Sequence, residues 1–143
     1  MTTGLERIAT KARSDQRLVF TSLAHHITPA LVQDSLERIP ARSSAGVDGM
    51  GVDAAKVLMN QWLPEMLGAV HRRGYKPLPV KRVYIPKPGK QKKRPIGIPS
   101  ITDRCLQNAT ATVLNAIYEQ DFLKCSMGGR AGRSAHQAVA TLQ

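Results

Sequence analysis

The chain has 143 residues, 42% of them hydrophobic, which is enough for one small domain with a core and excludes a disordered tail. Its formal net charge of +11 indicates a polyanionic partner such as nucleic acid. No apolar run is long enough for a membrane span, and the first residues lack the apolar core of a signal peptide, which favours a cytoplasmic location.

Helical patterns dominate the first forty residues. Residues 1–12 predict a short amphipathic helix, and residues 18–27 repeat apolar positions at helical spacing. Thr28 followed by Pro29 predicts a helix start, and Pro40 should end that helix. Its inward face is expected to comprise Leu31, Val32, Ser35, Leu36 and Ile39.

A loop over residues 41–51 should follow, with a turn at Asp48 and the glycine after it. Asp53 is expected to cap the next helix, which Pro64 must kink or divide, and Gly74 stands where a C-cap belongs. The apolar stripe of this helix is expected to comprise Val57, Leu58, Trp62, Met66 and Val70.

A β-hairpin is predicted next. Residues 80–85 and 96–98 read as strands, and residues 86–94 read as a basic turn, too long for a two-residue loop, so that we expect a mobile tip. One face should carry Lys81, Val83 and Ile85, and the other Val80, Arg82 and Tyr84.

The hairpin concentrates positive charge. No acidic residue lies between Glu65 and Asp103, and this interval holds Arg72, Arg73, Lys76, Lys81, Arg82, Lys87, Lys90, Lys92, Lys93 and Arg94. A phosphate-binding surface is favoured over a merely solvated sheet edge. Only two aromatic residues, Tyr75 and Tyr84, lie in this stretch, which favours contacts with the nucleic-acid backbone over base stacking.

Two further helices are expected. Ser100 caps the first, with Asp103 in its first turn and an end near Glu119. Its inward residues are expected to be Ile101, Cys105, Leu106, Ala109, Val113, Ala116 and Ile117. Ser134 and Gln137 form a capping box that opens a short last helix.

The sequence offers no metal site and no catalytic residue. Cys105 and Cys125 have no metal-ligand spacing and are expected to be reduced, partly buried thiols, and the four histidines form no ligand pattern. The ten acidic residues are scattered, whereas nucleotidyl transfer needs paired carboxylates that hold two metal ions.

Residues 77–88 (Pro-x-Pro-Val-Lys-Arg-Val-Tyr-Ile-Pro-Lys-Pro) and 94–104 (Arg-Pro-Ile-Gly-Ile-Pro-Ser-Ile-x-Asp-Arg) closely resemble the fingers hairpin of group II intron reverse transcriptases, the intron-encoded maturases. Residues 46–49 (Gly-Val-Asp-Gly) also resemble the family's sequence upstream of the hairpin. Residues 127–136 resemble its Gly-Phe-Arg-Pro-Gly-Arg-Ser-Ala-His segment, but with glycine in place of the aromatic residue and alanine in place of the proline, so that this loop should be less rigid.

The resemblance implies an α+β fold, mostly helical with one antiparallel hairpin: an N-terminal helical extension over residues 1–50 and a partial reverse transcriptase domain over residues 51–143. The family's catalytic aspartates and Mg belong to a palm that would lie downstream, so that we expect no cofactor in this chain. Lys87 and Arg94 match the cations that contact the triphosphate of the incoming nucleotide. The other nucleic-acid contacts implied are Lys81, Arg82, Lys90, Lys92, Lys93, Arg130 and Arg133, with a helix-capping role as the alternative for the last two.

The resemblance therefore implies a truncated RNA-directed DNA polymerase that binds template or intron RNA, a DNA primer and deoxynucleotide triphosphates. It leaves open a separate palm-containing polypeptide as a further partner. We expect no primer extension by this chain alone. A stand-alone maturase-like RNA-binding module and a non-functional remnant remain as alternatives.

Overall fold

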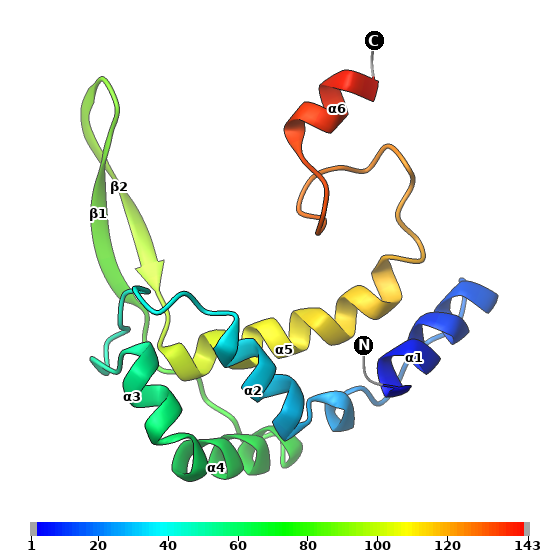
Figure 1. Ribbon diagram of the computed structural model, residues 1–143, viewed down its shortest axis with the longest axis horizontal. Coiled ribbons are helices and arrows are strands. Elements are labelled where there is room, and N and C mark those ends of the chain that lie inside the picture. The colour runs from blue at the N-terminus through cyan, green and yellow to red at the C-terminus, as the bar shows by residue number, and fades with distance from the viewer. Residues whose placement is uncertain (1–2, 142–143) are drawn as a thin grey trace. The chain divides into compact units, whose positions relative to one another are not determined.

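The computed structural model describes residues 3–141 and is mostly helical with one antiparallel hairpin, as predicted (Figure 1). In chain order, the elements are α1 (Thr3–Ser14), the 3₁₀ turn η1 (Ala24–His26), α2 (Pro29–Glu37), α3 (Val52–Val57), α4 (Met59–His71), β1 (Lys81–Lys87), β2 (Lys90–Ile98), α5 (Ile101–Tyr118) and α6 (Ala135–Thr141). No helix of the described residues is both long enough and apolar enough to cross a membrane.

The chain forms two compact units. The larger unit comprises residues 20–113, and the smaller unit combines residues up to 19 with residues from 114 onward. These limits differ from the predicted ranges 1–50 and 51–143, which follow the family resemblance rather than compactness and stay a prediction.

Helix α2 confirms the predicted start and inward face. The Thr28 side chain accepts a hydrogen bond from the Leu31 amide at 3.3 Å, and Pro29 occupies the first turn, where no intrahelical partner is needed. The buried face comprises Leu31, Val32, Ser35, Leu36 and Ile39. It contributes to the core of the larger unit, where α2 packs against α4.

The helical spacing of residues 18–27 was misleading, because only η1 forms there. The Asp15 carboxylate accepts the Arg17 amide at 2.9 Å, and the Asp15 carbonyl accepts the Leu18 amide at 3.2 Å. Such local bonds compete with a continuing helix. Val19 is consequently 78% exposed.

The division between α3 and α4 also differs from the prediction. The break falls at Leu58, whereas Pro64 lies inside α4, and Asp53 lies in the first turn of α3 rather than at its cap. The Trp62 indole donates a hydrogen bond of 2.8 Å to the Ala55 carbonyl, which satisfies a backbone group at the end of α3. The break changes the helical phase and leaves Val57, a member of the predicted apolar stripe, 80% exposed.

Helix α4 ends one residue earlier than Gly74 suggested. Arg73, not Gly74, takes the left-handed conformation, with a φ of 58°. The Arg73 amide bonds the Val70 carbonyl at 3.0 Å, and the Gly74 amide bonds the Ala69 carbonyl at 2.8 Å. This is a Schellman motif, and arginine occupies the position that glycine usually takes.

The hairpin is longer and its turn tighter than predicted. β1 and β2 continue through most of the expected basic turn, and only Pro88 and Gly89 connect them. Gly89 has a φ of 69°, which supplies the positive angle that a tight turn needs. The expectation of a long loop at the tip was therefore wrong, although the pairing shifts between Pro86 and Lys87. In the larger unit the hairpin projects away from the helices (Figure 1).

The smaller unit confirms two sequence predictions. Helix α1 buries Leu5, Ile8 and Ala12. The capping box at α6 is present, because the Ser134 hydroxyl accepts the Gln137 amide at 3.3 Å and the Gln137 side chain accepts the Ser134 amide at 2.9 Å.

Candidate nucleic-acid interface

The register of the hairpin decides which side chains share a face. Lys81 lies opposite Ile98, Val83 opposite Ile96, and Ile85 opposite Arg94. Directly opposed residues project from the same face, so the two faces divide as predicted. The second face, called here the tyrosine face, carries Arg82, Tyr84, Pro86, Lys93, Pro95 and Gly97.

Little of the hairpin is buried. Val83, Ile96 and Ile98 are half-buried, whereas Tyr84 and Ile85 are 58% and 41% exposed. A two-stranded hairpin without a covered face is marginally stable by itself, so its base must be held by the rest of the larger unit.

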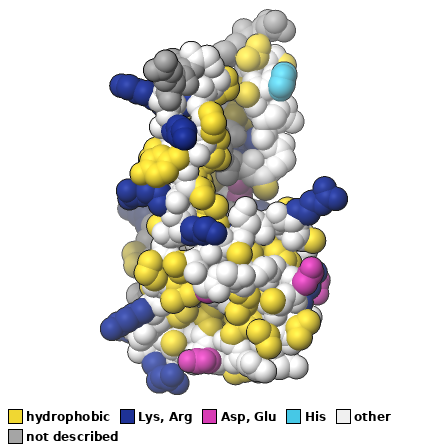
Figure 2. Space-filling view, turned by 90° about the vertical axis from the view of Figure 1, so that its left-hand side faces the viewer, with side chains coloured by type: hydrophobic (Ala, Val, Ile, Leu, Met, Phe, Trp, Pro, Cys, Tyr) yellow, Lys and Arg dark blue, Asp and Glu magenta, His cyan; other side chains and the backbone are white. Residues whose placement is uncertain are grey.

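The hairpin cations whose side chains the structure describes are exposed and form no ion pair with an acidic residue. The side chains of Lys81, Arg82, Lys87, Lys92, Lys93 and Arg94 are all exposed. The ion pairs found among the described residues, Asp34–Arg38 and Glu119–Arg130, lie outside the hairpin. Figure 2 shows one face of the molecule, on which Lys and Arg side chains stand out at several points and acidic ones at few. Like charges so close together repel one another unless a polyanion binds.

The two residues expected to bind a nucleotide triphosphate lie in different strands. Arg94 of β2 lies opposite Ile85, and Lys87 ends β1 two residues further along, beyond the irregular pairing. Lys87 pairs with Lys90, whose side chain lies outside what the structure describes. The roles of Lys87, Lys90 and Arg94 stay predictions.

A buried carboxylate anchors the chain that leads into β1. Asp103, in the first turn of α5, is 3% exposed. It accepts hydrogen bonds from the Ser100 hydroxyl at 2.8 Å, from the Leu78 amide at 3.2 Å and from the Tyr75 hydroxyl. Burial first, and then this hydrogen bond and the charge of Asp103, raise the pKa of Tyr75 above its usual range. The anchor fixes the direction in which the hairpin leaves the larger unit.

The loop before α3 packs against the start of α5, next to Asp103. A Cβ atom at Gly46 would lie 2.6 Å from the Ser100 Cα, so only glycine fits there. The Arg104 guanidinium donates to the Ser44 carbonyl. Asp48 has the structural turn role expected of it, because its carboxylate accepts the Met50 amide at 3.2 Å.

Arg130 is held inside the smaller unit. Its guanidinium donates to the Glu119 carboxylate at 2.7 Å and 3.2 Å, and to the carbonyls of Leu123 and Ser126 at 3.0 Å and 2.9 Å. It also lies 5.0 Å from the centroid of the Phe122 ring. The hydrogen bond from Arg130 lowers the pKa of Glu119. This arginine orders its loop, whereas Arg133 is exposed. Nucleic-acid contact by either residue stays a prediction.

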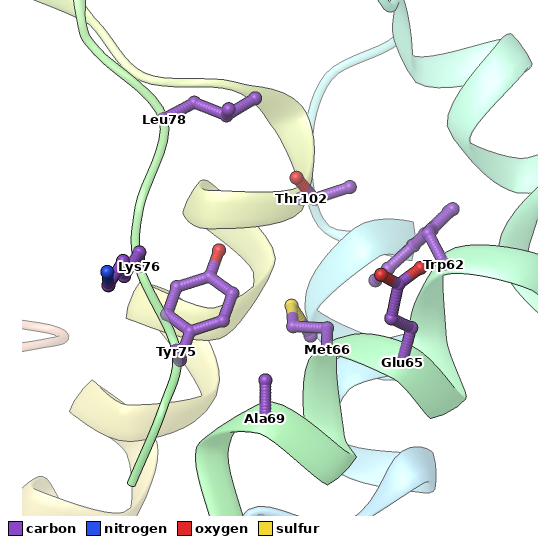
Figure 3. A pocket seen from close by; sticks show the side chains of 8 residues that line it. All are labelled: Trp62, Glu65, Met66, Ala69, Tyr75, Lys76, Leu78 and Thr102. Carbon is purple, nitrogen blue, oxygen red and sulfur yellow. The ribbon is translucent and has the colours of Figure 1, made fainter.

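A pocket of about 350 Å³ opens in the larger unit between α4, the segment before β1 and the start of α5. Figure 3 shows its lining: Trp62, Glu65, Met66, Ala69, Tyr75, Lys76, Leu78 and Thr102. The lining holds one acidic and one basic side chain, Glu65 and Lys76, and so lacks the concentration of cations that a phosphate site needs.

No group of three or more His, Cys, Asp or Glu side chains suited to a metal ion occurs within residues 3–141. Both cysteines are free. Cys105 is fully buried, and burial raises its pKa to about 11, whereas Cys125 is exposed rather than partly buried as expected.

Sequence reasoning found the cations but missed their support. Tyr75 was noted only as a scarce aromatic residue, and the contacts of Asp103 with residues 75 and 78 cross more than twenty positions of the chain. The local signal was the Ser-x-x-Asp pattern at Ser100, which predicts a helix cap but not these longer contacts.

Two curated proteins are similar to almost the whole chain. The group II intron-encoded protein LtrA of Lactococcus lactis subsp. cremoris is 31% identical over 140 residues, which cover 97% of this chain and 23% of LtrA. Protein YkfC of Escherichia coli (strain K12) is 36% identical over 144 residues, which cover 96% of this chain and 37% of YkfC. No protein-family model matches the chain. The chain thus corresponds to a minor part of each relative.

Proposed function

The chain is homologous to part of a group II intron-encoded protein, and we propose from this that it supplies the fingers of an intron-type RNA-directed DNA polymerase. In this role the hairpin binds template RNA and the phosphates of the incoming nucleotide. The observation that carries the proposal is the hairpin itself, in which all cations with described side chains are exposed and none is neutralised by an acidic neighbour.

The chemistry of these cations suits phosphate. Lysine supplies a point charge with three donors, and the planar guanidinium of Arg94 can donate two parallel hydrogen bonds to phosphate oxygens. Charge neutralisation of this kind positions a nucleotide without covalent chemistry by the protein. Tyr75, Asp103 and Gly46 support the proposal because they hold the base of the hairpin before the ligand arrives.

The test is the salt dependence of binding to a single-stranded RNA, measured by fluorescence anisotropy. Each phosphate neutralised on a single strand contributes about 0.7 to the slope of log affinity against log salt. The hairpin variant changes Lys90, Lys92 and Lys93 to Gln, and its slope should be shallower by ~2.

The matched control changes three lysines outside the hairpin, Lys11, Lys56 and Lys124, to Gln. All three side chains are exposed, so the net charge changes equally while the hairpin stays intact. A control with the wild-type slope supports the proposal. Equal loss in both variants, or a flat salt dependence of the wild type, would contradict it.

The triphosphate role is tested separately. Deoxynucleoside triphosphates should compete with a labelled analogue for the wild type, and Arg94→Gln and Lys87→Gln should each weaken that competition. Arg94→Lys should restore it incompletely, because an ammonium lacks the planar fork. Unchanged competition in all three variants would remove Lys87 and Arg94 from this role.

A further inference from the structure

Tyr84 is an exposed aromatic ring within a strongly basic surface. It lies in the middle of β1 and is 58% exposed. The other tyrosine of the basic stretch, Tyr75, is half-buried and donates its hydroxyl to Asp103. Tyr84 is therefore the aromatic ring that the hairpin offers to a ligand.

The neighbours of Tyr84 frame its ring. Pro95 lies directly opposite on β2, and Arg82 precedes Tyr84 by two positions on the same face. Lys93 is opposite Pro86, which places it on this face, on the other side of Tyr84 from Arg82 along the hairpin. Arg82, Lys93 and Pro95 are all exposed. Gly97, opposite Arg82, adds no side chain to this face, and the Val80 side chain lies beside it.

We propose that the tyrosine face binds one unpaired base of an RNA strand, which stacks on Tyr84 while Arg82 and Lys93 contact the phosphates on either side. The inference rests on the proposed function only in taking a nucleic-acid strand as the ligand. It adds a base contact to a surface for which the sequence indicates backbone contacts alone.

Charge complementarity favours this occupant. An aromatic ring with one cation on each side matches a base with its two flanking phosphates, since bases stack on aromatic faces and phosphates pair with Lys and Arg. An apolar protein partner would bury the same cations without neutralising them, which is costly. Stacking tolerates any base, because every base has a π face. A single ring limits the contact to one base.

The test compares four variants by anisotropy on single-stranded RNA. Tyr84→Ala should weaken binding by roughly 5- to 150-fold, the range found for one stacked base. Tyr84→Leu, which keeps a large apolar side chain opposite Pro95 and so should preserve the hairpin, should lose a similar factor. Tyr84→Phe should bind like the wild type, because stacking needs the ring and not the hydroxyl. Tyr118→Ala is the matched control, since Tyr118 is a tyrosine of similar exposure, 52%, that is not part of the hairpin.

Changing the RNA distinguishes base stacking from a merely structural role of Tyr84. On an otherwise identical strand that carries abasic sites throughout, Tyr84→Leu and the wild type should bind equally. Duplex RNA should show the same equality, because its bases are already stacked. The salt slope should not change in Tyr84→Leu, since no cation is lost.

The two proposals fail in different ways. Steep salt dependence with equal affinity of the wild type and Tyr84→Leu for single-stranded RNA would overturn the stacking inference and leave the phosphate interface standing. A loss in Tyr84→Leu that persists on abasic RNA would also overturn it, because the ring would then act without a base. Weak, salt-independent binding by the wild type would overturn the proposed function itself.

Discussion

Replacing the buried Asp103 with alanine should destabilise the larger unit more than replacing any one of the residues that donate hydrogen bonds to it. Three donors, on Ser100, Leu78 and Tyr75, would lose their acceptor. Hydrogen bonds to a charged group contribute about 1.5–3 kcal/mol each. Removing the buried carboxylate also removes its own desolvation cost of several kcal/mol. The net loss should be ~2–4 kcal/mol, a large part of the ~5–15 kcal/mol that holds a typical domain.

Urea denaturation followed by fluorescence measures this loss, because the single tryptophan, Trp62, lies in the larger unit. Tyr75→Phe should cost about 1.5 kcal/mol, the lower end of that range, since it removes one of the three hydrogen bonds and Tyr75 is only half-buried. In the double variant the Tyr75 change should add almost nothing, because its partner is already gone.

Asp53→Ala is the control, since Asp53 is an exposed acidic residue in the first turn of α3, and it should cost well under 1 kcal/mol. An Asp103→Ala protein with wild-type stability would refute the anchor. Additive losses in the double variant would show that Tyr75 and Asp103 stabilise the fold independently of each other.

Three further predictions concern single positions. Gly46→Ala should destabilise the larger unit by roughly 1–3 kcal/mol in the same urea assay, because the added methyl group meets the backbone of Ser100 at 2.6 Å, whereas Gly51→Ala, which meets nothing within 4 Å, should be much milder. Arg73→Gly should stabilise it by about 0.5–1 kcal/mol, since the φ of 58° strains any residue with a Cβ, and a destabilised variant would mean that the Arg73 side chain has a role beyond the cap. Stability should fall as pH rises from 9.0 through about 11, because burial raises the pKa of Cys105 and the folded state keeps a proton that the unfolded state releases. Cys105→Ala in a Tyr75→Phe background should remove this fall, and an unchanged pH profile would refute the assignment.

The sequence predicted those parts of the fold that depend on neighbouring residues. Thr28 with Pro29, and Ser134 with Gln137, were recognised as caps because each bond spans three positions or fewer. The alternation in β1 predicted the two faces of the hairpin. Its tight turn was missed because Lys90 and the residues after it resemble a basic loop, and only pairing with β1 makes them strand.

The errors have a common physical origin in contacts that no local pattern encodes. The break between α3 and α4 falls at Leu58, where the Trp62 indole reaches back seven residues to Ala55, and not at the conspicuous Pro64. The candidate interface was predictable as a concentration of charge, since charge is a property of composition. The exposure of Tyr84 and the role of Asp103 depended on the assembled structure.

The hydrogen bond from the Leu78 amide to Asp103 makes hydrogen exchange at this amide a measure of how often the base of the hairpin opens. The Leu78 side chain is 46% exposed, yet its amide proton is held by a carboxylate that is almost fully buried. That proton can exchange with solvent only when the carboxylate releases it, so its exchange rate measures how often the base of the hairpin comes loose. In each such opening the segment that leads into β1 is released from Asp103 of α5, until the hydrogen bond forms again. A bound strand should lengthen the intervals between these openings, and a single amide would record it.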